Sequence, residues 1–331
     1  MKNKNLLKFI TISFFLIFIF SVPIITLFTE DKKISEIENK ILTQLPRISF
    51  ENICNKKFMK NFDEYTSDQF PLRANFIKLK NTYNYIIGQR EFRDIYVGKN
   101  NKLMEKYKFN KESVGKNISN ILNTASYMYE SFNIKSKLMV VPTSIAFYKN
   151  DLPNFYISDN QKDSLDYINN SISNKDYLNF YTPYDILSKN KDKYIYYNTD
   201  HHWTQLGAYL SYLDMFDYKY DNKILFNNYN KVSNDFYGTY YSKALLPMIK
   251  GDSIYSYSNF NNFKIEIYFD KTYDTLYDND KLNGKNKYQY FLHGDPSFAI
   301  IYGDKNKSNE VIVFKDSYAH NLLPFLTNNY G

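Results

Sequence analysis

Three residues of this 331-residue chain have the types that nucleophilic acyl chemistry requires, and they are Asp200, His202 and Ser317. A serine hydroxyl is a weak nucleophile until an imidazole takes its proton, and a carboxylate holds that imidazole in the useful tautomer. Asp200 and His202 lie in the stretch YYNTDHHWT at 196–204, which also holds the only tryptophan of the chain. If the stretch is extended, residues two positions apart share a face, so Asp200 and His202 point into one cleft while His201 faces the other side.

A close Asp–His pair also occurs as a plain structural hydrogen bond or as part of a metal site. His201, His202 and His293 are an alternative zinc site, but adjacent histidines diverge and the chain has no His-x₃-His spacing. A cysteine cluster and an internal disulfide are both excluded, because Cys54 is the only cysteine. We therefore expect a site without a metal ion or an organic cofactor.

Ser317 stands between a β-branched run, Val311–Phe314, and apolar residues with helical spacing at 322–326. An α/β fold exposes a nucleophile where a strand gives way to a helix, and the first N–H groups of that helix stabilise a developing oxyanion. The alternative is that Ser317 or Asp316 only caps the helix. Asn321, one turn further on, is either an additional oxyanion donor or a solvated surface residue.

The elements that must position these residues follow an α/β pattern. A helix is predicted over Lys111–Phe132, and the apolar run Leu138–Thr143 is typical of a strand buried in a parallel sheet. A helical stretch at Gln161–Ser173 and a short strand at Tyr177–Tyr181 come next. Strand, helix and strand at this spacing indicate a βαβ unit, so we predict an α/β sandwich with a mainly parallel sheet. Another helix is predicted over Thr204–Phe216.

The amino terminus has the properties of a membrane anchor. Leu6–Phe28 is an apolar run long enough to cross a bilayer as a helix, with Lys2, Lys4 and Lys8 at its start. No good cleavage site of the Ala-x-Ala kind follows, which favours an uncleaved signal anchor. The short leader has little to translocate, so we expect a single-pass protein of the cell membrane with its soluble part outside the cytoplasm.

Three regions are predicted from these patterns. Residues 1–30 form the anchor, and residues 31–92 form a helical linker region with a helix over Lys33–Leu45. Residues 93–331 form the catalytic domain, which includes a hairpin over Ile95–Met104 and an insertion at about 217–290. The net charge is +7, but Lys and Arg are spread along the chain without a basic block, so we expect no nucleic-acid partner.

Several motifs together resemble one known family. The letters DHHW at 200–203 are similar to the motif that names the DHHW family of low-GC Gram-positive bacteria. Further blocks resemble that family in the same order: DQFPLR at 68–73, YVGK at 96–99, VPT at 141–143, GAY at 207–209 and KDSYA at 315–319. The resemblance covers most of the chain after the anchor.

The DHHW family in turn resembles the SGNH-hydrolase-like proteins that O-acetylate alginate and other exopolysaccharides. This resemblance implies a flavodoxin-like three-layer sandwich, with Asp200 as triad acid, His202 as base and Ser317 as nucleophile. Two positions depart from the pattern: Lys315 stands where SGNH hydrolases usually carry Gly, and His320 stands where relatives often carry Asn. Relatives also continue into another strand, so we expect this chain to be incomplete at its C-terminus.

The expected function is transfer of an acyl group, above all acetyl, to a cell-surface polysaccharide through the triad. The resemblance also implies a membrane-bound O-acyltransferase as the partner that supplies the acyl group. Two alternatives stay open, a carbohydrate esterase of the same fold and a non-catalytic surface protein that binds or assembles glycans.

Overall fold

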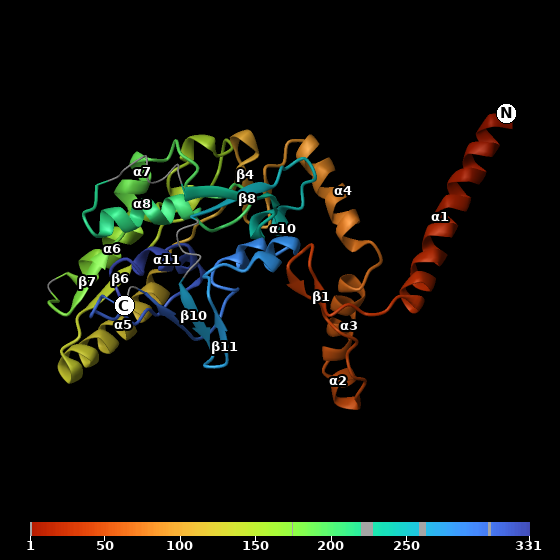
Figure 1. Cartoon of the computed structure of the whole chain (residues 1–331). Helices are drawn as coiled ribbons and strands as arrows, with labels where there is room; N and C mark the ends of the chain where they lie inside the picture. The colour runs from red at the N-terminus through yellow and green to blue at the C-terminus, as the bar shows by residue number, and fades with distance from the viewer. Residues whose placement is uncertain (1, 174, 220–227, 258–262, 304–305) are drawn as a thin grey trace. The chain divides into compact units, whose positions relative to one another are not determined.

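The structure is a computed structural model that describes residues 2–173, 175–219, 228–257, 263–303 and 306–331. The chain divides into two compact units, whose elements are coloured by residue number in Figure 1. The first unit consists of Met1–Gln89 and Leu245–Pro247, and the second consists of Arg90–Ala244 and Met248–Gly331. The three candidate triad residues therefore all lie in the second unit.

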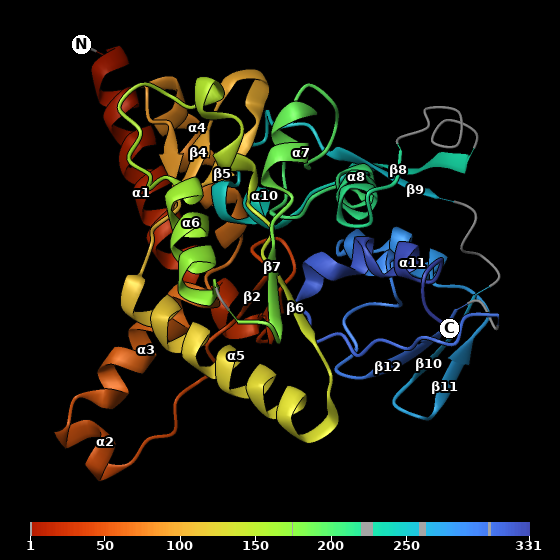
Figure 2. The ribbon, with the colours of Figure 1, turned by 90° about the vertical axis from the view of Figure 1, so that its left-hand side faces the viewer.

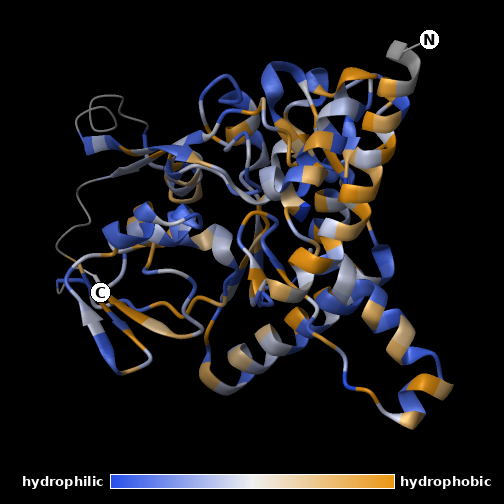
Figure 3. Ribbon diagram, turned by 90° about the vertical axis from the view of Figure 1, so that its right-hand side faces the viewer, coloured by the Kyte–Doolittle hydropathy of each residue, from blue (hydrophilic) through white to orange (hydrophobic). Residues whose placement is uncertain are grey.

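The first unit begins with helix α1, Lys2–Phe28, much of which is hydrophobic in Figure 3. Its segment Leu6–Thr26 is 21 residues long and has a mean hydropathy of 2.5. Length and composition suffice to cross a bilayer, a test that a signal sequence near an N-terminus also passes. The predicted apolar helix is confirmed, while its anchoring role and its orientation stay predictions.

The rest of the first unit contains a hairpin and three helices. Strand β1, Ile34–Ser35, pairs antiparallel with β2, Lys40–Ile41. The predicted helix over Lys33–Leu45 is wrong, because the chain reverses through Asn39, which has a φ of +50°. The helices that follow are α2, Phe50–Cys54, α3, Lys57–Asp68, and α4, Arg73–Ile86.

The DQFPLR block at 68–73 connects α3 and α4 to that hairpin through ion pairs with buried carboxylates. Arg73 Nε donates to Glu38 Oε2 at 2.9 Å, and Lys40 Nζ donates to Asp68 Oδ1 at 2.6 Å. The acidic partners Glu38 and Asp68 are 6% and 5% exposed. Burying a carboxylate is tolerated only when it is paired in this way, so this motif has a structural explanation within the first unit.

In the described part of the chain, the strands of the second unit form four small sheets. Their orders are β3-β4-β5, β6-β7, β8-β9 and β11-β10-β12. The strand bounds are Glu91–Phe92, Ile95–Val97 and Leu103–Glu105 for β3 to β5, Ser136–Met139 and Leu178–Tyr181 for β6 and β7, Tyr229–Phe236 and Asp252–Tyr257 for β8 and β9, and Lys264–Ile267, Lys271–Tyr273 and Ala299–Tyr302 for β10 to β12. The antiparallel pair β4–β5 is the hairpin that the sequence predicts over Ile95–Met104.

The fold is mixed α/β, but a mainly parallel sheet is not what the described residues show. Strands β6 and β7 are parallel, with Ser136 opposite Leu178, and the βαβ prediction is confirmed because α6 lies between them in the chain. The other pairs are antiparallel. Most of them join strands that are close in sequence, and a short connection allows antiparallel pairing but not a parallel crossover.

The predicted strand Val311–Phe314 is also wrong. In the described structure these residues form no strand, and Ile312 and Phe314 are 74% and 89% exposed. A β-branched run favours a strand where a neighbour pairs with its backbone and a core covers its side chains. Ser317 therefore follows an irregular segment instead of the end of a strand.

Two predicted helices pack beside the parallel pair, as Figure 2 shows. Helix α5, Lys111–Phe132, has the predicted bounds and starts at Asn110, whose side chain accepts a hydrogen bond from Ser113 N at 2.9 Å. Helix α6 spans Gln161–Ile172. The small core that these elements share consists of Ile118, Ala125, Ile172 and Leu178.

The main core of the second unit surrounds Trp203 and helix α8, Gln205–Met215. Residues 205–213 of α8 are all buried, as expected of a helix that is enclosed in a core. The other α-helices that the structure describes in this unit are α7, Tyr184–Lys189, α10, Thr239–Ala244, and α11, Leu323–Leu326. The predicted insertion at 217–290 includes 220–227 and 258–262, which lie outside the described residues. Its described part supplies β8–β11 and α10 to this unit.

Candidate active site

The stretch from Tyr196 to Thr204 is a tight loop instead of an extended strand. Tyr196 and Trp203 form an antiparallel bridge across it, and Thr204 is the N-cap of α8. Within the loop, Asp200 Oδ1 accepts hydrogen bonds from the backbone N and the Nδ1 of His202, at 3.0 and 2.5 Å. The predicted divergence of His201 is wrong, because the loop turns here and brings its ring centroid to 3.8 Å from that of His202.

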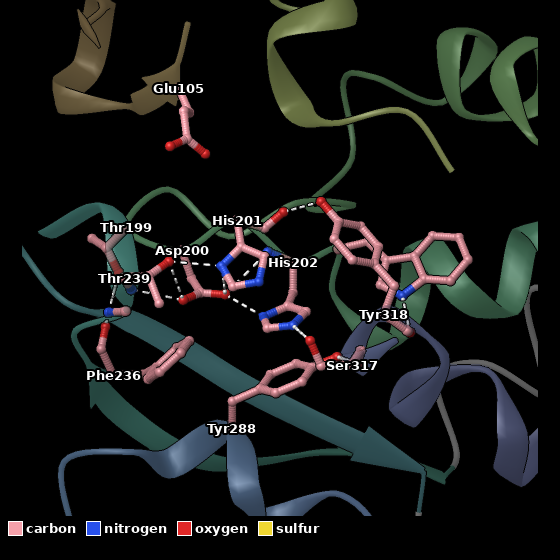
Figure 4. A network of polar contacts seen from close by, with 12 residues as sticks. Glu105, Thr199, Asp200, His201, His202, Phe236, Thr239, Tyr288, Ser317 and Tyr318 are labelled. Carbon is pink, nitrogen blue, oxygen red and sulfur yellow. Dashed lines mark hydrogen bonds and ion pairs between the residues drawn. The ribbon is translucent and has the colours of Figure 1, made fainter. Parts of the chain in front are cut away.

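His202 lies between Asp200 and Ser317, as Figure 4 shows. Its Nε2 is 2.8 Å from Ser317 Oγ, and its Nδ1 is 2.5 Å from Asp200 Oδ1. Asp200 and His202 are 2% and 5% exposed, whereas Ser317 is half-buried. The structure thus brings together the three residues that the sequence singles out, and Ser317 is the most accessible of them.

The carboxylate of Asp200 is also held on its far side by Thr239. Asp200 Oδ2 accepts from the backbone N and the Oγ1 of Thr239 at 2.8 and 3.2 Å, and His201 Nδ1 lies 2.7 Å from the same Oγ1. Burial alone would raise the pKa of Asp200, but His202, His201 and the Thr239 N–H outweigh it and lower that pKa below 3.8. Asp200 is therefore ionised at neutral pH and keeps a proton on His202 Nδ1, which leaves Nε2 able to accept one from Ser317.

Gly238 packs directly against this acid. A Cβ at position 238 would lie 2.2 Å from the Cβ of Asp200 and 2.3 Å from its Oδ2. We expect Gly238→Ala to displace the carboxylate of Asp200 from its position beside His202. Overpacking of this kind costs about 1–3 kcal/mol of stability, and a misplacement of ~1 Å costs about 10²-fold in turnover.

Thermal unfolding and ester hydrolysis measure the two effects of Gly238→Ala. Gly115→Ala in α5 is the matched control, because its new Cβ would meet the Tyr167 hydroxyl at an ordinary 3.6 Å. We expect that control to keep wild-type turnover. If the two variants have the same turnover and the same thermal stability, the close approach of Gly238 to Asp200 does not matter for function.

Asp252 holds the residues just before the acid. Its Oδ1 accepts from Tyr194 Oη at 2.7 Å and from Asn198 N at 2.9 Å. Its Oδ2 accepts from the N and Oγ1 of Thr199, at 2.7 and 2.6 Å. Burial raises the pKa of Asp252 above 3.8, although these hydrogen bonds oppose the rise. Asp252 thus fixes the backbone from which Asp200 projects. Sequence reasoning missed it, because it lies in the predicted insertion and no spacing links it to 198–200.

Backbone contacts connect Ser317 and its neighbours to the DHHW loop. Asp316 is the N-cap of the 3₁₀ helix η7, Ser317–Asn321, and its side chain accepts from Tyr318 N at 3.0 Å. The cap is therefore Asp316, and the hydroxyl of Ser317 contacts His202 instead. Trp203 Nε1 donates to Tyr318 O at 2.8 Å, which joins the single tryptophan to the segment that carries Ser317.

Asn321 is neither a solvated residue nor an oxyanion donor. It is 0% exposed, and its Nδ2 donates to Trp203 O at 2.9 Å. The amide is thereby turned to the loop that carries His202. The backbone N–H of Ser317, at the first position of η7, is a candidate oxyanion donor in its place.

Tyr288, another residue that sequence reasoning missed, contacts both His202 and Ser317. Its ring is parallel to the imidazole of His202, with a centroid distance of 3.7 Å and an interplanar angle of 9°. Its hydroxyl donates to Ser317 O at 2.9 Å. Burial, and then the charge of Asp200, raise the pKa of Tyr288 well above 10, so this hydroxyl stays a donor. One tyrosine among 34 carries no recognisable signal in the sequence.

His320 is a buried histidine beside Tyr288. Its Nε2 is 2.7 Å from Lys315 Nζ and 3.1 Å from Asp295 Oδ1. Burial, and then the charge of Lys315, lower its pKa from 6.5 to about 4. Below pH 6.5 the unfolded chain takes up a proton at His320, while the folded chain stays neutral there until about pH 4. The resulting loss of stability across this window is roughly 3 kcal/mol.

We therefore expect the free energy of unfolding to fall as pH is lowered from 6.5 to about 4, and His320→Asn to flatten this slope. Burial also lowers the pKa of His201, so part of the slope persists in the variant. Denaturant unfolding followed by the fluorescence of Trp203, the only tryptophan, measures the effect. A slope that is as steep in His320→Asn as in wild type contradicts this assignment.

Asp200, His201 and His202 also form a group that could hold a metal ion, since one potential ligand atom of each lies within 4.8 Å of the others. The alternative site with His293 is wrong, because His293 Nε2 lies 2.8 Å from Thr275 O and its ring stacks on Tyr273. Both ring nitrogens of His202 and both carboxylate oxygens of Asp200 already take part in hydrogen bonds. The donor set therefore fits a proton relay better than a cation.

The fold and the site define a mixed α/β protein with an Asp–His–Ser arrangement. A family model described as DHHW protein matches residues 92–331, so the chain belongs to the DHHW family. Comparison with curated proteins gives no match.

The solved structures that are similar to this chain include a DHHW family protein and PatB1. One is a DHHW family protein from Eubacterium siraeum, with a TM-score of 0.57 and 23% identity over 69% of this chain and 76% of that chain. The other is Bacillus cereus PatB1 with a sulfonyl adduct, with a TM-score of 0.55 and 17% identity over 71% of this chain and 83% of that chain. At these identities the likeness shows a shared fold.

Proposed function

We propose that this protein is an extracytoplasmic SGNH-like enzyme that transfers an acyl group, acetyl above all, to a cell-surface polysaccharide. The observation that carries the proposal is the position of His202, whose two ring nitrogens contact Asp200 and Ser317 at 2.5 and 2.8 Å. A base that is oriented by a buried carboxylate and touches a half-buried hydroxyl is the arrangement that activates a serine nucleophile.

The reaction follows from this geometry in two halves. Ser317 Oγ attacks the acyl carbonyl carbon as its proton passes to His202 Nε2. The bond to the donor's leaving oxygen breaks, and that oxygen takes the proton from His202, which leaves an acyl ester on Ser317. A sugar hydroxyl then gives its proton to His202 and attacks the acyl carbon, and Ser317 Oγ leaves and recovers the proton. Asp200 stabilises the imidazolium in both halves.

The cellular location of the reaction and its membrane partner are inferred from the family resemblance and from the amino-terminal helix. We propose that α1 is an uncleaved anchor that holds the second unit outside the cytoplasm, close to a membrane-bound O-acyltransferase that supplies the acyl group. We also propose that residues 93–331 form an SGNH-like three-layer sandwich. The parallel pair β6–β7, with α5 and α6 packed beside it, supports that architecture.

The decisive experiment asks whether Ser317 is an activated nucleophile. The full chain in detergent is treated with a sulfonyl fluoride, a probe suggested by the sulfonyl adduct of PatB1. Intact mass and peptide mapping are expected to show one sulfonyl group on Ser317 in wild type and none in Ser317→Ala. Ser126→Ala, a change of a surface serine on α5 that bonds Glu130, is the matched control and is expected to label normally.

The same proteins are then given p-nitrophenyl acetate with and without an oligosaccharide. Transfer predicts an acetylated sugar and faster release of p-nitrophenol when the sugar is present, whereas an esterase releases acetate regardless. Ser317→Ala is expected to abolish both. The proposal is wrong if wild type and Ser317→Ala are equally active and Ser317 is not labelled. That outcome favours the alternative of a non-catalytic protein that binds glycans.

A further inference from the structure

We propose that Tyr288 is a positioning residue that stabilises the imidazolium form of His202 through the face of its ring. This inference rests on the proposed function, because the imidazolium forms only when His202 takes the proton of Ser317. The two rings are parallel within 9° and their centroids are 3.7 Å apart. A cation over an aromatic face within ~6 Å of its centroid is attracted by the negative charge of the π system.

Burial makes this contact stronger than a surface stack. His202 is 5% exposed and Tyr288 is 8% exposed, so little water screens the attraction. The hydroxyl of Tyr288 donates to Ser317 O at 2.9 Å, which holds the ring at a set position relative to the nucleophile as well as the base. Tyr288 thus contacts both groups that exchange the proton.

The stack acts on the transition state more than on the resting enzyme. In the resting state His202 is a neutral acceptor toward Ser317, and the ring contact is ordinary packing. As the proton moves, positive charge develops on His202 between the Asp200 carboxylate and the Tyr288 ring. An interaction that strengthens as charge develops lowers the barrier and raises kcat instead of lowering KM. The neighbouring ring of His320, 5.9 Å from that of Tyr288, does not compete because its pKa is lowered to about 4.

The experiment separates ring electrostatics from packing. Tyr288→Phe keeps the ring and removes the hydroxyl, and we expect a loss of roughly 2- to 10-fold in the rate of Ser317 sulfonylation and in kcat. Pentafluorophenylalanine at position 288 has nearly the same shape as Phe but a reversed ring quadrupole. We expect it to react at least about 10-fold more slowly than Tyr288→Phe, with KM unchanged.

Tyr290 provides the matched control in the same 3₁₀ segment, η6, Lys287–Tyr290. Its ring stacks on Tyr277, at 4.9 Å and 8°, instead of on His202. Phe and pentafluorophenylalanine at position 290 are expected to react at equal rates. Unfolding followed by Trp203 fluorescence verifies that each variant is folded. If the fluorinated protein does not fold, Tyr288→Leu replaces it in the comparison with Tyr288→Phe, with the same expected loss.

The outcomes are distinguishable. Equal rates for Phe and pentafluorophenylalanine at position 288, in a protein whose wild type is labelled at Ser317, overturn the role of Tyr288 and leave the proposed function standing. A loss at position 290 as large as at position 288 overturns it as well, because the effect is then general to the segment. A wild type that is neither labelled nor active overturns the proposed function and with it the role of Tyr288.

Discussion

Replacing His202 by alanine is expected to lower kcat by on the order of 10⁴-fold or more. His202 Nε2 is the group placed to accept the proton of Ser317, at 2.8 Å, and without it the hydroxyl is a weak nucleophile. Substrate binding does not need the imidazole, so KM is expected to change little.

His202→Ala also leaves a cavity with the shape of the lost imidazole ring, so the variant can be tested by chemical rescue. The lost ring is buried against Tyr288, so free imidazole is expected to enter and restore part of the turnover. His293→Ala is the matched control, since His293 stacks on Tyr273 at 3.9 Å and 18° in a comparable way but lies outside the triad. We expect it to lose stability and keep kcat. A His202→Ala enzyme within about tenfold of wild type contradicts the base assignment.

The second large effect is expected for Asp200→Asn, which should lower kcat by roughly 10⁴-fold. An amide offers one acceptor oxygen and one NH₂ donor where the carboxylate offers two acceptors. In the wild type, Thr239 N–H donates to Asp200 Oδ2 and His202 N–H donates to Asp200 Oδ1. The NH₂ group of an asparagine at position 200 must therefore face one of these two donors. If it faces His202, Nδ1 becomes an acceptor and the proton moves to Nε2, the tautomer that cannot take a proton from Ser317.

Steady-state kinetics and ¹⁵N NMR of labelled histidine measure both parts of this prediction, the loss of kcat and the change of tautomer at His202. Asp214→Asn is a suitable control, because Asp214 is an exposed acceptor for Tyr181 Oη at 2.9 Å, outside the candidate site. It is expected to keep wild-type kinetics. Asp200→Asn with nearly full activity and an unchanged Nδ1–H signal would show that the carboxylate does not control the tautomer.

Local sequence pattern predicted the helices better than the strands. Lys111–Phe132 has a capping Asn110 at its start and apolar residues on one face, and the observed helix has the predicted bounds. The run Val311–Phe314 has strong β-propensity, yet it forms no strand in the described structure. A helix closes its hydrogen bonds within its own segment, whereas a strand depends on a partner elsewhere in the chain.

Dependence on a distant partner also explains why the sequence did not reveal the residues around the triad. Sequence reasoning missed Thr239, Gly238, Asp252 and Tyr288, because each acts through a contact with a residue far along the chain and none has a reactive group of unusual type. Gly238 matters only for the missing Cβ beside Asp200, and Tyr288 only for the ring that faces His202. Nothing in the local pattern around these positions encodes such neighbours.

The sequence by itself determined which residue types were available for chemistry, the apolar amino-terminal helix and the DHHW motif that indicates the family. It could name Asp200, His202 and Ser317 because few side chains can act as acid, base and nucleophile. Only the tertiary structure decided that His202 and Ser317, 115 positions apart, lie 2.8 Å from each other. It also decided that Asp316 is the cap, that Asn321 turns away and that His201 lies beside His202. Those outcomes depend on how buried surfaces pack across the whole unit, which no spacing along the chain records.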